Sequence, residues 1–217
     1  MTVVTYWVLI IGIVVFWELS FVLYHRQIHQ DSHPPTLTAN LPTLHDVLND
    51  WSEQAIVWTK QSDVAQYDPW RRRMILSRHW KQSWDLIAAH IVAHERSHAN
   101  QSRGWVMLGG FRMIWAVVWG VVAGLGWVLS PGSVIGGIVA QWITDSVGRR
   151  RIEWDADQRA ISYLTQTMND TDRSAVITWG QQIAQNHRRA LTVEGAGWSG
   201  LTLILAAVTH QIWLWTH

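Results

Sequence analysis

The sequence has no cysteine, only 5 prolines among 217 residues and a charged fraction of only 15%. Without cysteine the chain can form neither a disulfide framework nor a thiolate metal site, and it has no cysteine nucleophile. Its formal net charge of +1 gives no sequence-wide electrostatic reason to bind nucleic acid, so no nucleic-acid partner is expected. Intrinsic disorder is excluded because 48% of the residues are hydrophobic.

Apolar segments predict an integral membrane protein. Four of them are present, at about residues 3–23, 113–129, 133–144 and 197–215. The first is as long as a helix that crosses a hydrocarbon core of ~30 Å. It has no basic n-region before it, which favours an uncleaved span over a signal peptide. A Ser-Pro-Gly turn at residues 130–132 joins the second and third segments into a helical hairpin, whose second arm is short for a full span.

The distribution of basic residues predicts the orientation of the chain. All 17 Lys and Arg residues lie within residues 26–112 or 149–189. By the positive-inside rule, the segments at about 25–110 and 146–196 face the cytoplasm and both termini lie on the other side. We therefore expect one mainly α, membrane-embedded domain over residues 1–217, in the cell inner or plasma membrane. It would have about four transmembrane or intramembrane helices and the lipid bilayer as a partner.

A histidine-rich helix is predicted around residues 84–100. His90, His94 and His98 recur at every fourth position, so their imidazoles lie on one helical face. Residues 94–98 have the HExxH pattern, in which two histidines bind Zn²⁺ and the glutamate serves as general base. The pattern therefore predicts zinc ligands at His94 and His98 and a catalytic base at Glu95.

A catalytic zinc site needs a third protein ligand and leaves the fourth position to water. No third histidine follows at the spacing used by metzincins. Beyond the hairpin, the helical pattern of residues 152–164 places Glu153 and Asp157 on one face. Glu153 is the expected third ligand, and Asp157 could hydrogen-bond a ligand imidazole; the alternative is a solvated helix face. His90 is expected to pack beside the ligands, because as a ligand it would compete with Glu153.

Several motifs resemble the YugP-type neutral zinc metallopeptidases of membranes. They are the YDP element at residues 67–69, the RMILS run at 73–77, AAHIVAHERSHANQ at 88–101 and IEWDADQRAISYL at 152–164. The resemblance extends from about Leu44 to the last apolar segment. The ExxAD form that begins at Glu153 also resembles the HtpX and CAAX prenyl protease group, which shares this gluzincin layout. The chain departs from the YugP pattern at Ser97 and Asp157, where that family has Gly and Ser, and neither change removes a ligand.

This resemblance implies zinc on His94, His98 and Glu153, with Glu95 as the base. The expected function is that of a zinc metalloendopeptidase, a hydrolase that cleaves peptide bonds of membrane or unfolded proteins with a metal-activated water. An oxyanion donor is also required, and His187 and Tyr163 are the candidates.

The catalytic region is expected to be zincin-like and cytoplasmic, with a small β-hairpin. In that hairpin residues 72–77 would pair with residues 55–59 and present an edge to an extended peptide substrate, or serve a purely structural role.

Two other classes of function remain open. His90 and His94 could hold iron in a membrane oxidase, although the chain lacks the additional clustered histidines of such sites. A catalytically silent membrane scaffold could also keep this fold and bind partners. The presence of both Glu95 and Glu153 argues against a scaffold, which needs no base beside a complete ligand set.

Overall fold

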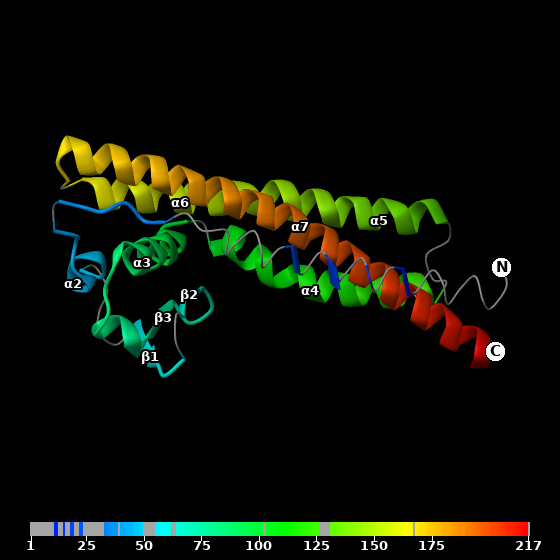
Figure 1. The fold of residues 1–217 in the computed structure, drawn as a ribbon. Coiled ribbons are helices and arrows are strands. Elements are labelled where there is room, and N and C mark those ends of the chain that lie inside the picture. The colour runs from blue at the N-terminus through cyan, green and yellow to red at the C-terminus, as the bar shows by residue number, and fades with distance from the viewer. Residues whose placement is uncertain are drawn as a thin grey trace. The chain divides into compact units, whose positions relative to one another are not determined.

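A computed structural model describes residues 11–12, 15, 18–19, 22–23, 33–38, 40–49, 55–61, 64–101, 103–125, 131–166 and 168–216. The chain is mainly helical and has one small sheet (Figure 1). It divides into two compact units, each described by itself. The helical unit comprises residues 1–30, 108–150 and 186–217, and the mixed unit comprises residues 31–107 and 151–185.

The sheet of the mixed unit has three short strands. They are β1 (Ile56–Thr59), β2 (Ala65–Asp68) and β3 (Arg73–Ser77), in the spatial order β1-β3-β2. β3 pairs parallel with β1 and antiparallel with β2, so only β2 and β3 form a hairpin. The predicted pairing of residues 55–59 with residues 72–77 is present, but the prediction that they form a hairpin is wrong because these two strands run parallel.

Sequence analysis missed β2, which is the antiparallel edge strand. The strand has four residues, ends at Asp68 and is followed at once by Pro69, so it gives little periodic signal. Its position leaves β3 in the centre of the sheet with a neighbour on either side. A peptide that adds to the sheet beside β2 would therefore meet the outer edge of β2 and not β3.

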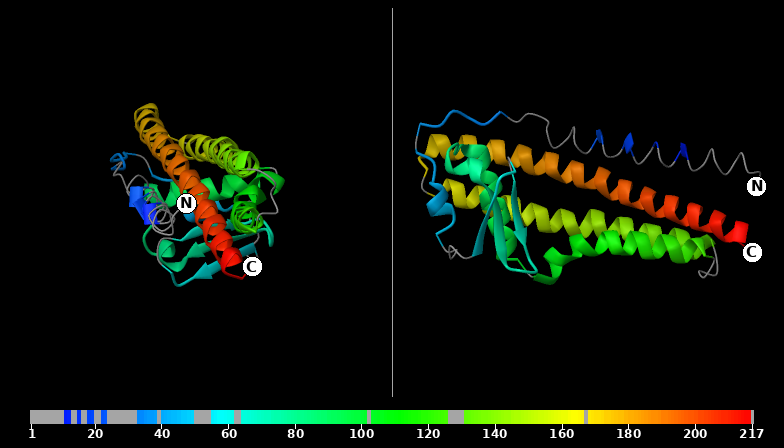
Figure 2. Two further views of the ribbon diagram at one scale, coloured as in Figure 1. Left: turned by 90° about the vertical axis from the view of Figure 1, so that its right-hand side faces the viewer. Right: turned by 90° about the horizontal axis from the view of Figure 1, so that it is seen from below.

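Two helices of the mixed unit carry the residues of the predicted site. They are α3 (Leu86–Ala99) and α6 (Arg150–Thr165). α3 begins where the Asp85 carboxylate accepts a hydrogen bond of 2.8 Å from the Ala88 amide, which is an N-cap contact. α3 and the strands lie side by side in the views of Figure 1 and Figure 2. The buried core that joins these elements includes Met74, Leu76, Leu86, Val92, Ala160 and Leu164.

The remaining helices match the predicted apolar segments in part. α5 (Pro131–Ile143) lies within two residues of the predicted segment 133–144, and the π-helix η3 (Thr144–Arg149) follows it directly. α4 (Arg103–Gly124) begins ten residues before the predicted segment 113–129. Of the final five residues of that segment, residue 125 is a turn. Residues 126–129 and the predicted turn residue Ser130 lie outside the described residues. Of the predicted span 3–23, the described residues 11, 12, 15, 18, 19, 22 and 23 are helical, and the others lie outside the description.

The largest difference concerns the last apolar segment. It is not a separate helix, because α7 runs without a break from Asp170 to Thr216 over 47 residues. The stretch contains no proline, so nothing in it forces the helix to stop where the composition changes at residue 197. Hydropathy marks where the environment of a helix changes, and it does not mark where a helix ends.

α4 and α7 approach closely within the helical unit. Gly120 and Gly124 are four residues apart on α4, the spacing of the small-residue motif that lets helix backbones meet. A Cβ atom on Gly124 would lie 2.6 Å from the carbonyl oxygen of Ala206, and one on Gly120 would lie 2.7 Å from the Leu205 Cβ. The Thr202 hydroxyl of α7 also donates a buried hydrogen bond of 2.9 Å to the Gln141 side chain of α5.

Among the described residues, one helix is long and apolar enough to cross a membrane. It is α7, over Asp170–Trp213, and residues Ile114–Gly124 of α4 form a shorter apolar helix. A single helix of this kind is weak support for a membrane protein, because a core helix of a soluble protein can pass the same test. The four predicted spans therefore stay a prediction.

The close approach of α4 and α7 predicts that Gly124→Ala destabilises the fold. The added methyl group would meet the backbone of Ala206, which cannot rotate away, so we expect a loss of about 1–3 kcal/mol. Thermal unfolding of the purified protein measures the effect. The control is Gly136→Ala on α5, where a Cβ meets nothing within 4 Å and where replacing glycine favours the helix. Equal melting temperatures for the two variants would contradict the close packing.

Candidate metal centre

Three side chains from two helices converge at the predicted site. His94 and His98 come from α3 and Glu153 comes from α6. Glu153 Oε2 lies 3.1 Å from His94 Nε2 and 3.3 Å from His98 Nε2, and the two Nε2 atoms are 3.2 Å apart. The two histidines are each only 8% exposed. The structure thus brings together the three residues that the sequence predicted as ligands.

The outer nitrogen of each imidazole already has a partner. His94 Nδ1 lies 2.6 Å from Asp157 Oδ1, and His98 Nδ1 lies 2.9 Å from the Gln101 side-chain oxygen. A carboxylate and an amide oxygen accept hydrogen bonds, so both Nδ1 atoms carry the hydrogen. In the neutral imidazole each Nε2 then carries a lone pair, and the two lone pairs face the carboxylate oxygen of Glu153.

This triangle of acceptor atoms suits a tetrahedral zinc ion. Ligands about 2.0–2.1 Å from a tetrahedral Zn²⁺ are about 3.3 Å apart, close to the distances of 3.1–3.3 Å found here. Buried acceptors that face one another without a hydrogen between them are unfavourable unless a cation lies among them. Two imidazoles, each with a partner at Nδ1, and one carboxylate are a donor set of the kind that catalytic zinc sites use.

Gln101 is a member of this cluster whose contacts sequence analysis missed. Its side-chain nitrogen donates hydrogen bonds of 2.7 Å to the Ile152 carbonyl and 3.0 Å to the Asp155 carboxylate. These contacts fix the amide so that its oxygen faces His98. Gln101 thereby links the end of α3 to α6. Its place three residues after His98 was the available signal, but a lone glutamine beyond a helix end has no characteristic chemistry.

Glu95 lies beside the cluster and contacts the edge strand. Its Oε2 accepts a hydrogen bond of 2.8 Å from the backbone amide of Tyr67 in β2. This contact shows which way the edge of β2 faces. Val64 and Ser77 form a hydrogen-bonded pair, so Ala65 and Tyr67 direct their backbone groups away from β3. The YDP element at residues 67–69 was recognisable in the sequence, but the contact of the Tyr67 backbone amide with Glu95 was not.

The electrostatics of the cluster follow from burial and from the facing charges. Burial alone would lower the pKa of His94, but Asp157 and Glu153 outweigh it and hold this pKa well above 6.5. Burial opposes the charged form of His98 too, yet Glu153 raises its pKa. Burial would raise the pKa of Glu153, whereas its hydrogen bonds to the two histidines hold it well below 4.5. The pKa of Glu95 is raised by burial, against the opposing charges of the histidines.

His90 lies next to Asp157, the residue that contacts His94. The side chain is 4% exposed, its Nε2 lies 3.8 Å from Asp157 Oδ1, and its ring meets the edge of the Trp179 ring. Within the part of the chain that is described, its Nδ1 has no hydrogen-bond partner. This position agrees with the predicted packing role beside the ligands.

The two candidates for an oxyanion donor lie in different places. The Tyr163 hydroxyl donates a hydrogen bond of 2.6 Å to the backbone carbonyl of Asp46, and its ring lies under the Arg96 guanidinium. Tyr163 thus holds α2 (Leu44–Val47) against α6, and its hydroxyl is directed at α2; its role as an oxyanion donor stays a prediction. His187 lies on α7 within the helical unit.

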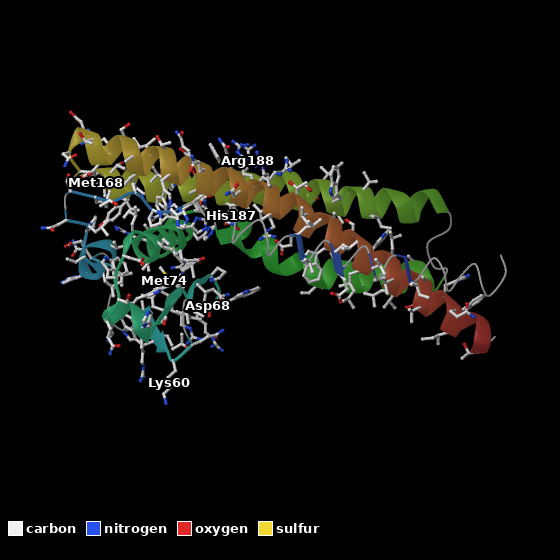
Figure 3. The ribbon with its side chains drawn as sticks, viewed as in Figure 1. Lys60, Asp68, Met74, Met168, His187 and Arg188 are labelled. Carbon is white, nitrogen blue, oxygen red and sulfur yellow. The ribbon has the colours of Figure 1, made fainter. Side chains whose placement is uncertain are left out.

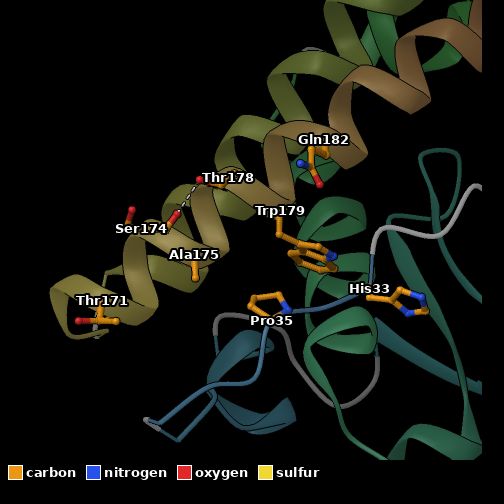
Figure 4. Close-up of a pocket in the computed structure, with 8 residues that line it drawn as sticks. All are labelled: His33, Pro35, Thr171, Ser174, Ala175, Thr178, Trp179 and Gln182. Carbon is orange, nitrogen blue, oxygen red and sulfur yellow. Dashed lines mark hydrogen bonds between the residues drawn. The ribbon is translucent and has the colours of Figure 1, made fainter.

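A cavity of about 580 Å³ lies elsewhere in the mixed unit. Figure 4 shows it between residues 33–35 and the first turns of α7, with the Trp179 ring turned into it. Its walls are hydroxyl, amide and apolar groups: Thr171, Ser174, Ala175, Thr178 and Gln182. Only His33 among its lining residues is titratable, so the cavity has no catalytic set of its own.

Comparison of the chain with protein-family models, with curated proteins and with solved structures gives no significant match. The resemblance to membrane zinc metallopeptidases therefore stays a prediction from the motifs quoted above.

The pKa shifts predict how the stability of the metal-free protein depends on pH. The raised pKa values of His94 and His98 contribute stability that is full below 6.5 and is lost as the pH rises through the raised values. The lowered pKa of Glu153 contributes stability that is present above 4.5 and is lost as the pH falls through its lowered value. Melting of chelator-treated protein should therefore occur at lower temperature at about pH 9 than at about pH 6.

Glu153→Gln is the test variant for this pH dependence. It removes the charge that raises the pKa of His98 and that, together with Asp157, raises the pKa of His94, so the loss of stability at alkaline pH should become smaller. Asp170→Asn is the control, since that carboxylate is 99% exposed and forms only a surface ion pair with Arg173. An unchanged pH profile in Glu153→Gln would contradict the assigned electrostatics.

Proposed function

We propose that the chain is a zinc-dependent endopeptidase of membranes that hydrolyses peptide bonds of membrane or unfolded proteins. The observation that supports it most is the triangle of His94 Nε2, His98 Nε2 and Glu153 Oε2, with sides of 3.1–3.3 Å. The partners on both Nδ1 atoms add to this support because they leave the lone pairs directed at one point. Such a set of acceptors suits a divalent cation.

Each residue near the triangle has a role in hydrolysis. Bound zinc would supply the Lewis acid that polarises water and the scissile carbonyl. Glu95 accepts the water proton and later passes it to the leaving amine, and its raised pKa suits that exchange. The Tyr67 amide holds one oxygen of this carboxylate in place. Asp157 and Gln101 keep the imidazoles in the tautomer that directs Nε2 at the metal.

The outer edge of β2 is the proposed binding edge for the substrate. The backbone groups of Ala65 and Tyr67 face away from β3, and the Tyr67 amide already reaches Glu95. An extended peptide beside β2 would pair with the backbone groups of Ala65 and with the Tyr67 carbonyl, since the Tyr67 N–H is taken by Glu95, and it would lie next to the base and the ligand triangle. Main-chain pairing requires little of the substrate's side chains, which suits cleavage of unfolded segments.

Membrane insertion is part of the same proposal. α7 is the described helix that meets the length and composition of a span, and the glycine contact of α4 with α7 is of the kind found between membrane helices. The confinement of all Lys and Arg to residues 26–112 and 149–189 supports a cytoplasmic site and termini on the other side. The remaining spans are proposed from hydropathy alone.

The proposed chemistry predicts different losses for the base and for a ligand. Glu95→Gln keeps the size of the side chain but cannot accept a proton, so hydrolysis should fall by roughly two orders of magnitude or more while zinc stays bound. Glu153→Ala removes one of three ligands, so both zinc and activity should be lost. Elemental analysis and cleavage of an unfolded protein and a reconstituted membrane protein are the measurements.

Asp170→Asn serves as the control for the loss of a carboxylate and should keep zinc and activity. Hydrolysis that survives Glu95→Gln would contradict the assigned mechanism. Stoichiometric iron would favour the oxidase alternative. Bound zinc without cleavage of either substrate by the wild type would favour a catalytically silent scaffold.

The charge distribution predicts which side of the membrane each segment faces. Because the chain lacks cysteine, Gln61→Cys, Thr171→Cys and Thr216→Cys each introduce a single thiol. An impermeant thiol reagent added to intact cells should label position 216 and should reach positions 61 and 171 only after the membrane is opened. Labelling of position 61 in intact cells would overturn the orientation.

A further inference from the structure

The loop between β2 and β3 presents an exposed tryptophan beside arginines. The loop, residues 69–72, lies at one end of the sheet, and the Trp70 side chain is 64% exposed. Arg71 and Arg72 are exposed as well. Asp68, labelled in Figure 3, marks this end of the sheet, and Lys60 follows β1 at the opposite end. We call residues 69–72 the Trp-Arg loop.

The Trp-Arg loop has a fixed shape and a net positive charge. The Asp68 carboxylate accepts hydrogen bonds of 3.0 Å from the Trp70 amide and 3.1 Å from the Arg71 amide. It also lies 3.4 Å from Arg73 Nε, so one arginine neutralises its charge. Within the described residues no acidic side chain pairs with the guanidinium of Arg71 or Arg72. Two positive charges beside Trp70 are therefore uncompensated.

Arg72 has a backbone conformation that favours glycine. Its φ is 50°, and among the described residues it is the one non-glycine residue with a positive φ. A side chain at such a position strains the backbone, and local strain of this kind concentrates at functional positions. Glycine would build the turn with less strain, but it would not supply a second charge at the exposed end of the sheet.

We propose that the Trp-Arg loop binds the surface of a bilayer that contains anionic lipids. Tryptophan has an apolar ring and a polar N–H, so it favours the boundary between headgroups and acyl chains. Arginine forms paired hydrogen bonds with phosphate groups, and an anionic leaflet attracts uncompensated cations. An acidic polypeptide could satisfy the arginines, but it would not require a large exposed aromatic ring beside them. The binding does not depend on zinc or on hydrolysis.

A fluorescent label on the loop tests this binding. The full chain with Arg71→Cys carries one thiol for an environment-sensitive dye and keeps Trp70 and Arg72. The protein is incorporated into nanodiscs of phosphatidylcholine, with or without phosphatidylserine. We expect dye emission at shorter wavelength, and stronger quenching by a lipid-borne quencher, in the discs with phosphatidylserine. Added salt should weaken both signals. The same dye at Lys60→Cys, at the other end of the sheet, is the control and should change little.

Two variants separate lipid binding from a structural role. Added to the labelled chain, Arg72→Gly should lower the ratio of bound to free loop about fivefold, the effect of one cation at an anionic surface. The same change should leave the melting temperature equal or higher, because glycine relieves the positive φ. Trp70→Ser should reduce quenching in both types of disc.

Equal signals in the two types of disc, or equal signals from the labels at positions 71 and 60, would overturn the proposal. A shift of emission caused by polyglutamate but not by phosphatidylserine would show an acidic polypeptide as the partner instead. A lower melting temperature in Arg72→Gly would show that Arg72 has a structural role.

Discussion

The convergence of three lone-pair atoms in a buried site is the constraint on which the arrangement of α3 and α6 depends. Nothing in α3 alone brings His94 and His98 to a third acceptor, and the third acceptor is 59 residues from His94 in the sequence. Asp157 and Gln101 take up the outer nitrogens, so each imidazole has one orientation. Without a metal ion, protons on the histidines balance the facing carboxylates, which is why the pKa values of His94 and His98 are raised.

Much of this cluster could be predicted from spacing within helices. A four-residue repeat fixes which side chains share a face, so His94, His98, Glu153 and Asp157 were recognisable before their helices were placed. Gln101 and the Tyr67 amide were not, because their roles depend on contacts between segments far apart in the chain. A backbone amide also has no signature in a sequence, since every residue except proline has one. The Tyr163 hydroxyl shows the converse, a plausible donor that tertiary packing directs elsewhere.

The fold was predictable to a similar degree. Apolar composition located α5 well but could not show that α7 continues through a change of composition without interruption. Nor could composition give the order of the strands, because β1 pairs with β3 although β2 lies between them in the sequence. Strand order is decided by which partners satisfy the backbone, and four-residue strands carry too few side chains to record that choice. The spacing of Gly120 and Gly124 can be read from the sequence. Their contact with α7 is long-range and could not be predicted from that spacing alone.

The separation of the two halves of the cluster has a consequence for biosynthesis. During translation α3 leaves the ribosome first, and α4 and α5 must follow before α6 exists. Until then His94 and His98 have no third acceptor, and Asp157 and the partners of Gln101 on α6 are missing too. The nascent chain therefore cannot assemble the cluster while the intervening helices are being placed. Whatever chemistry the completed cluster supports is therefore absent until α6 has been synthesised.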